Sequence, residues 1–158
     1  QQELERVEVS FPPGGDIAAS VRQPTNGIEA RFSLEYVIAA SLLRETLLLA
    51  DFSQGALDEE IAALAQPVAR RPDLTAPPDA LNPANRFHQV TIFLRTGETL
   101  QKRFTRQQSL AIPFDLAGKV DTCLSHATDT QREEVVALSR LESRDSLPRL
   151  TDLLFTER

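Results

Sequence analysis

The stretch FSLEYVIAASLL at residues 32–43 decides how the rest of this 158-residue chain must fold. Ser33 is a residue type preferred at helix N-caps, and from Leu34 onward apolar side chains point in nearly every direction around a helix. A surface helix shows one apolar stripe instead, so this pattern predicts a buried helix that other elements surround. A polar group near its start, such as Tyr36, can then face a cleft.

The segments around this helix show strand and helix patterns in turn. Residues 7–11 alternate apolar and polar side chains, which predicts a half-buried strand, and residues 16–31 have no sustained period, which predicts a loop. Asp58 is expected to cap an amphipathic helix, and 68–71 is a short extended candidate. Residues 72–85 contain four prolines, whose missing N–H groups prevent regular pairing, so we expect a surface loop there.

The clearest strand signal forms a hairpin around residues 95–97. A three-residue loop with Gly97 in the left-handed conformation pairs Ile92 with Leu100. A two-residue loop would instead place the apolar side chains of the two strands on opposite faces of the sheet. We therefore expect the three-residue loop.

The last third of the chain changes to helical patterns. Asp115 can cap one helix, residues 131–142 carry the apolar stripe of a second, and Ser146 can cap a third. Three helices after a strand-rich part predict an α+β domain at 1–108 and a helical segment at 109–158. The expected fold class is α+β: a small sheet with a buried central helix, followed by C-terminal helices.

Composition disfavours several classes of protein. The chain is 41% hydrophobic and 25% charged, with a net charge of −6, so its long-range field repels nucleic acid and anionic membranes. The apolar run 37–43 is separated from 47–50 by charged residues and falls short of the roughly 18–20 residues that a bilayer requires. We expect no membrane span, no signal peptide and no nucleic-acid partner.

The sequence shows no metal-binding or cofactor-binding pattern. Cys123 is the single cysteine, which excludes an intrachain disulfide, fits a cytoplasmic location and is expected to be a small core hydrophobe. His88 and His126 have no second ligand at metal spacing, so we expect structural or surface roles and no metal. The basic pair Arg70 and Arg71 is expected to be solvated.

Two residues near the central helix are candidates for chemistry. A tyrosine in the first turns of a buried helix needs a partner or a wet cavity for its hydroxyl. Judged from spacing alone, Tyr36 is expected to be a core residue whose hydroxyl bonds to a neighbour, in preference to a catalytic residue. Arg31 either binds a substrate carboxylate or pairs with Glu29 or Glu35.

A resemblance to a known family favours the catalytic interpretation of these two residues over the structural one. The stretch 24–43 contains the pattern P-x-x-x-x-E-A-[KR]-F-S-x-x-Y and closely resembles the MmgE/PrpD family, which includes 2-methylcitrate dehydratase, cis-aconitate decarboxylase and an iminodisuccinate epimerase. The acidic "D-F" loop at 51–52, the Gly-turn hairpin and "R-L-E" at 140–142 follow in the family's order. Phe32 stands where some members have histidine, and Arg44-Glu45 replaces the usual Asp-Gly.

The resemblance implies a two-domain, cofactor-independent enzyme whose active site lies between a large all-helical domain and an α+β lid. Residues 1–108 would be most of the lid, incomplete at its N-terminus, and 109–158 would pack on the helical domain. Tyr36 matches the family's site tyrosine and would act as the catalytic residue. Arg31 and Ser33 would bind the substrate, and the helical domain would supply the acid/base histidines and aspartate.

The expected function is therefore that of the C-terminal part of a lyase or isomerase that acts on a small polycarboxylate, as in propionate metabolism. The chain has no methionine and begins at Gln1, so we expect a processed or truncated piece. We expect this piece to be inactive alone, because the acid/base histidines that the resemblance implies are not in it. Its expected partners are the substrate, the missing N-terminal helical domain and further copies of itself in a homo-oligomer. The alternative is a noncatalytic α+β module that binds a protein.

Overall fold

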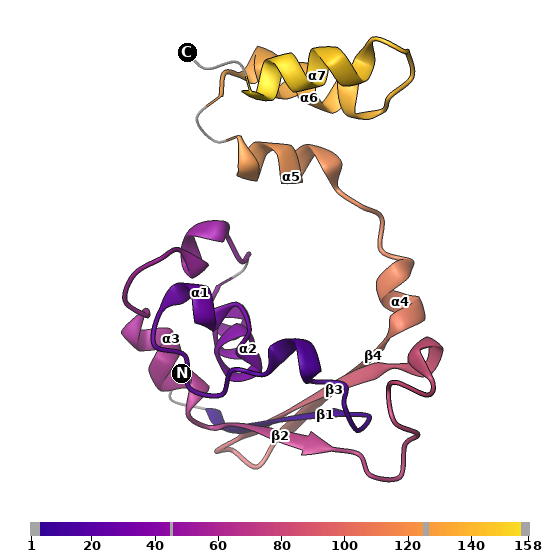
Figure 1. Cartoon of the computed structure of the whole chain (residues 1–158). Coiled ribbons are helices and arrows are strands. Elements are labelled where there is room, and N and C mark those ends of the chain that lie inside the picture. The colour runs from indigo at the N-terminus through magenta and orange to yellow at the C-terminus, as the bar shows by residue number, and fades with distance from the viewer. Residues whose placement is uncertain (1–3, 45, 125–126, 156–158) are drawn as a thin grey trace. The chain divides into compact units, whose positions relative to one another are not determined.

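The computed structural model describes residues 4–44, 46–124 and 127–155, and these form an α+β fold with a four-stranded mixed sheet and seven helices. The chain divides into two compact units, residues 1–112 and 113–158, which are described separately below. Figure 1 labels the elements. In chain order they are β1 (Leu4–Phe11), η1 (Ile17–Ala19), α1 (Gly27–Ala30), α2 (Leu34–Leu43), η2 (Leu49–Phe52), α3 (Glu59–Ala65), β2 (Val68–Pro72), η3 (Pro83–Asn85), β3 (Phe87–Leu94), β4 (Thr99–Thr105), α4 (Arg106–Leu110), α5 (Leu116–Cys123), α6 (Asp129–Ser139) and α7 (Ser146–Phe155).

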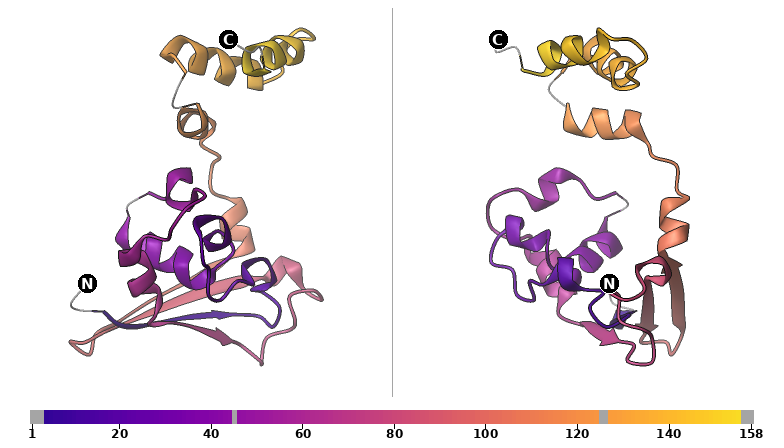
Figure 2. Two further views of the ribbon diagram at one scale, coloured as in Figure 1. Left: turned by 60° about the vertical axis from the view of Figure 1, so that its left-hand side comes forward. Right: turned by 45° about the vertical axis from the view of Figure 1, so that its right-hand side comes forward.

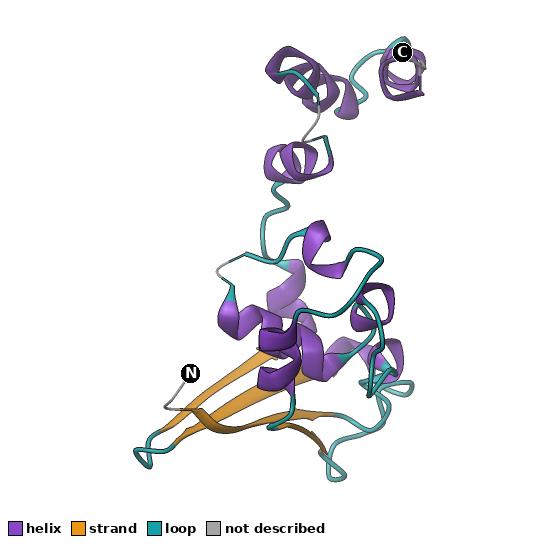
Figure 3. Cartoon of the chain, turned by 90° about the vertical axis from the view of Figure 1, so that its left-hand side faces the viewer, coloured by secondary structure: helices purple, strands orange, loops and turns teal. Residues whose placement is uncertain are grey.

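The sheet has the order β2-β1-β3-β4, with β1 and β2 parallel and the other pairs antiparallel. A parallel pair needs a crossover connection, and the segment that contains α1, α2 and α3 provides it. These helices lie over one face of the sheet (Figures 1 and 3). The proline that ends β2 stands at the edge of the sheet, where a missing N–H group costs no ladder hydrogen bond.

Helix α2 connects two hydrophobic clusters, which explains its apolar side chains in several directions. Leu34 and Ile38 pack against the cluster on the sheet, whose buried members are Val7, Val9, Phe11 and Val68. The opposite side contributes Tyr36, Ala39 and Ala40 to a second cluster with Ile61 of α3. The prediction of a buried central helix is confirmed on these two sides, whereas Leu42 is 42% exposed.

The expected hairpin is confirmed in register. Ile92 pairs with Leu100, Leu94 N–H donates to the carbonyl of Glu98, and Gly97 has φ +89°. The hairpin lies alongside β1 (Figure 2). The caps predicted at Ser33, Asp58 and Asp115 also form.

Several local predictions were wrong. Residues 27–30 form the single-turn helix α1, because the Asn26 side chain caps it, instead of continuing a loop. Cys123 is exposed, since α5 buries only Val120 among its residues. Leu141 lies outside α6 with φ +52°, and the Ser146 hydroxyl bonds with Ser143 from inside α7.

Candidate functional site

Tyr36 joins α2 to the start of α3. Its side chain is 2% exposed, and its ring meets Phe52 edge-on at 6.3 Å between centroids. The backbone N–H of Asp58, the N-cap of α3, donates to the tyrosine hydroxyl over 3.2 Å. Ser33 caps α2 by accepting the N–H of Tyr36 and thereby fixes the turn from which the tyrosine projects.

The Tyr36 hydroxyl has a raised pKa and, like that of an ordinary tyrosine, is protonated at neutral pH. Burial is the strongest influence and raises the pKa of Tyr36 above its ordinary 10.0. The hydrogen bond from Asp58 acts in the other direction, while the negative charges of Asp58 and Asp51 raise the pKa further. A neutral phenol is a proton donor, and no acceptor for the Tyr36 proton is found among the described residues.

A cavity of about 170 Å³ lies beside this tyrosine. Tyr36, Ser33 and Glu35 line it from the start of α2, and Arg22 lines it from the preceding loop. Apolar side chains of α3 and the residues next to it complete the wall. The cavity thus combines a proton donor with charged groups, as a site for a small polar molecule requires.

Three charged side chains hold one wall of this cavity in place. Arg70 of β2 donates from Nε and Nη2 to the two carboxylate oxygens of Glu35, over 2.6 and 2.7 Å. Its Nη1 donates to Asp16 over 2.8 Å, and the arginine side chain is only 4% exposed. Burial alone would raise the pKa of Glu35, but the hydrogen bonds and charge of Arg70 outweigh it and hold the pKa below 4.5.

The structure places the three predicted site residues differently. Tyr36 and Ser33 line the same cavity, whereas Arg31 is not part of its lining. Arg31 donates from Nε and Nη2 to the carbonyl of Phe52, over 3.1 and 2.9 Å. It pairs with neither Glu29, which binds Thr25, nor Glu35.

The pair of Glu35 and Arg70 was not predicted from the sequence, and the expectation that Arg70 is solvated was wrong. The available signal was strand alternation, because Arg70 lies two residues after the buried Val68 and so faces the same side of the sheet. Asp16 is brought to the pair by the loop after β1, which no sequence period marks.

Other sequence candidates lie away from this cavity. His88 donates from Nε2 to the carbonyl of Gly15 over 3.3 Å, and His126 lies outside the described residues. Among the described residues, no group of three or more histidine, cysteine, aspartate and glutamate side chains is placed to hold a metal ion. No described helix combines the length and apolar character needed to cross a membrane.

Comparison with known families places this arrangement in context. The model of the MmgE/PrpD C-terminal domain matches residues 1–142 of the chain. The match includes the whole α+β unit, Tyr36 and the cavity beside it. No curated protein matches the sequence.

Proposed function

The chain belongs to the MmgE/PrpD family, and from this premise we propose that it is the C-terminal, lid-like part of a cofactor-independent lyase or isomerase. Its substrate would be a small polycarboxylate, and its reaction would begin with removal of a proton from the carbon next to a carboxylate. The activity most similar to this proposal is that of 2-methylcitrate dehydratase.

The single observation that carries the proposal is the buried side chain of Tyr36, which lines a cavity and whose hydroxyl accepts the N–H of Asp58. In a dehydration, a base takes the C–H proton, the C–OH bond breaks, and the departing oxygen takes up a proton and leaves as water. A base supplied by the helical domain would perform the first transfer. Tyr36 would donate, or relay, the proton to the departing oxygen.

Arg31 and Ser33 would support this reaction in different ways. The Nη1 group of Arg31 makes no hydrogen bond to a described residue, so it is open to a substrate carboxylate while Nε and Nη2 stay anchored on Phe52. The Ser33 hydroxyl is engaged with the Tyr36 N–H and with Glu35. Its contribution would therefore be to position the tyrosine beside the substrate.

The second candidate function is a noncatalytic module that binds a protein. One observation favours it: the described part of the terminal helices leaves large apolar side chains exposed, including Leu147 and Leu154 of α7. An apolar helix face of this kind suits a partner protein as well as a helical domain of the same enzyme.

The substitution Tyr36→Phe separates these functions. In an enzyme assembled from this chain and a helical domain of the family, we expect kcat for 2-methylcitrate to fall by about a hundredfold or more, the usual effect of losing an acid catalyst. The unfolding free energy should fall by only about 1 kcal/mol, because the ring is kept and one hydrogen bond is lost.

Thr91→Val is the matched control, since Thr91 is a buried sheet residue whose hydroxyl accepts a hydrogen bond from Gln101. It should cost similar stability and leave kcat near normal. If Tyr36→Phe also retains normal turnover, the tyrosine is a core residue and the catalytic proposal fails.

A further inference from the structure

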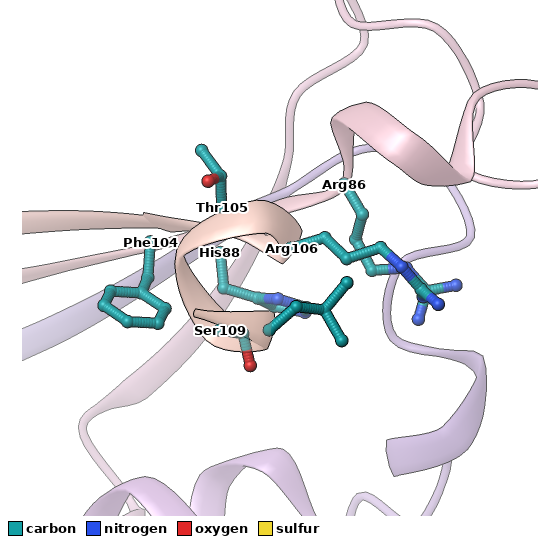
Figure 4. A pocket seen from close by; sticks show the side chains of 7 residues that line it. Arg86, His88, Phe104, Thr105, Arg106 and Ser109 are labelled. Atoms are coloured by element: carbon teal, nitrogen blue, oxygen red, sulfur yellow. The ribbon is translucent and has the colours of Figure 1, made fainter. Parts of the chain in front are cut away.

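A second, larger cavity lies at the end of the hairpin, where β3 begins and β4 continues into α4. Its volume is about 340 Å³, within the range of roughly 300–1,000 Å³ that small-molecule sites occupy. It shares no lining residue with the cavity beside Tyr36. Figure 4 shows its side chains, which include two arginines, one histidine and one phenylalanine.

The charges around this cavity do not balance. Arg86 forms a two-pronged ion pair with the buried carboxylate of Asp79 and is thereby neutralised. Arg106 lines the same cavity, and its guanidinium makes no hydrogen bond or ion pair with any described residue, although, after the hydrogen bonds of Arg86, its charge also lowers the pKa of the Asp79 carboxylate. One positive charge is therefore left over, in a chain whose net charge is −6.

The walls of the cavity are held by contacts that need no ligand. The backbone N–H of Arg106 donates to the carbonyl of Arg86 over 2.9 Å, which ties the two arginines together. His88 is fixed by its bond to Gly15 and by its ring, which lies 6.1 Å from that of Phe11 between centroids. These contacts fix the backbone at Arg106 and the ring of His88 without a ligand.

The lining offers both apolar and polar groups. Phe104 and Leu110 present exposed apolar surface, while Arg106 and the Ser109 hydroxyl provide hydrogen-bond donors. In Figure 4 the ring of Phe104 lies on the other side of the α4 turn from the arginine side chains. A ligand that uses both kinds of group has an anionic end and an apolar end.

We propose that this cavity binds a small organic anion. Its carboxylate or phosphate group would accept hydrogen bonds from Arg106 and Ser109, and its apolar part would contact Leu110. This site is separate from the one proposed for catalysis and does not depend on that function. The protein would thus recognise an oxyanion in a place where no reaction occurs.

The test is a titration of the full 158-residue chain with isobutyrate, monitored by the backbone amide NMR signals. Isobutyramide, which has the same shape without charge, and inorganic phosphate, which has charge without an apolar part, are the comparison probes. We expect isobutyrate to shift the signals of residues 104–110 with a dissociation constant of about 1 mM, typical of a ligand this small. Isobutyramide should produce no such shifts, and phosphate should bind more weakly than isobutyrate.

Arg106→Gln should weaken isobutyrate binding about tenfold, because it removes the charge-assisted hydrogen bond. Arg95→Gln is the matched control: it makes the same charge change in the loop at the other end of β3 and should leave binding unchanged. Dispersed amide spectra of both variants would show that they fold. The proposal fails if isobutyramide or phosphate binds as tightly as isobutyrate. It also fails if the two variants lose isobutyrate affinity equally, or if isobutyrate shifts no signals in residues 104–110.

Discussion

Burial of the charged Arg70 side chain costs solvation free energy, and its ion pairs must offset that cost. The side chain is almost fully covered, and an unpaired guanidinium there would cost several kcal/mol of solvation. Glu35 and Asp16 offset that cost with three hydrogen bonds. The ion pair therefore specifies where the start of α2 lies on the sheet, next to the cavity of Tyr36.

Arg70→Met should lower the unfolding free energy by about 2–3 kcal/mol, because it leaves two carboxylates together without their partner. Arg71→Met is the control, since Arg71 is mostly exposed and reaches Glu8 only at 3.5 Å, and it should cost less than about 1 kcal/mol. Urea unfolding at pH 7 measures both. Equal losses of unfolding free energy in the two variants would mean that the buried ion pairs of Arg70 contribute no more stability than the exposed pair of Arg71.

The same network makes stability depend on pH. The pKa of Glu35 is lower in the folded chain than its ordinary 4.5, so its contribution is complete above pH 4.5 and is lost as the pH falls through the folded pKa. The difference between the wild type and Arg70→Met should accordingly shrink as the pH falls below 4.5. A difference that stays constant down to the lowest pH at which both proteins fold would contradict this.

At the scale of elements, α1 depends on a glycine for close packing. A Cβ at Gly27 would stand 2.0 Å from the carbonyl oxygen of Ser53, which is backbone and cannot turn aside. The loop that carries Phe52 therefore approaches α1 closely, and Phe52 in turn contacts Tyr36 and binds Arg31. Gly27 thus lets one loop reach two of the proposed site residues.

Gly27→Ala should cost about 1–3 kcal/mol of unfolding free energy, because the loop must move away to avoid the new methyl group. It should also shift the NMR signals of the Tyr36 ring. Gly97→Ala is the comparison: its methyl group meets nothing within 4 Å, but its φ of +89° makes the change cost about 1 kcal/mol. Unchanged Tyr36 signals in Gly27→Ala would show that the loop does not position the site.

Elements with a sustained period or a cap could be predicted from the sequence. Alternation located β1, the turn chemistry at Gly97 set the hairpin register, and Ser33 marked the start of α2. Helix α1 could not be found this way, since four residues are too short to show a period. Its boundaries come from the Asn26 cap and from packing.

The candidate site could be predicted from the sequence only where its residues are close together in the chain. Tyr36 and Ser33 share a helix turn, so local spacing was enough to bring them together. Arg70, Asp16 and Glu35 come from three segments distant in sequence, and only the fold joins them. Cys123 and Leu141 were misplaced because an apolar stripe does not reveal whether a partner element covers it.

At the scale of the whole molecule, the described helices of residues 113–158 bury few large side chains. Val120, Val135 and Leu138 are covered, whereas Leu147 is 60% exposed. Burying this apolar surface against another protein surface would be favourable. We therefore expect the isolated chain to self-associate.

Sedimentation velocity over a range of concentrations tests this expectation, and the sedimentation coefficient should rise with concentration. Leu147→Glu should reduce the association, while Leu74→Glu, an equally nonconservative change at an exposed leucine of the first unit, should not. A strict monomer with strong hydrogen-exchange protection in α5, α6 and α7 would instead show a self-sufficient unit and favour the protein-binding alternative.

We propose that this chain completes an active site whose base lies in a helical domain, and reconstitution tests this proposal most directly. Turnover of 2-methylcitrate should be measured for the chain alone, for a helical domain of the family alone, and for the two together, with and without a chelator. We expect no turnover by either part alone and chelator-resistant turnover by the mixture. Turnover by the 158-residue chain alone, or none by a mixture shown to form a complex, would contradict it.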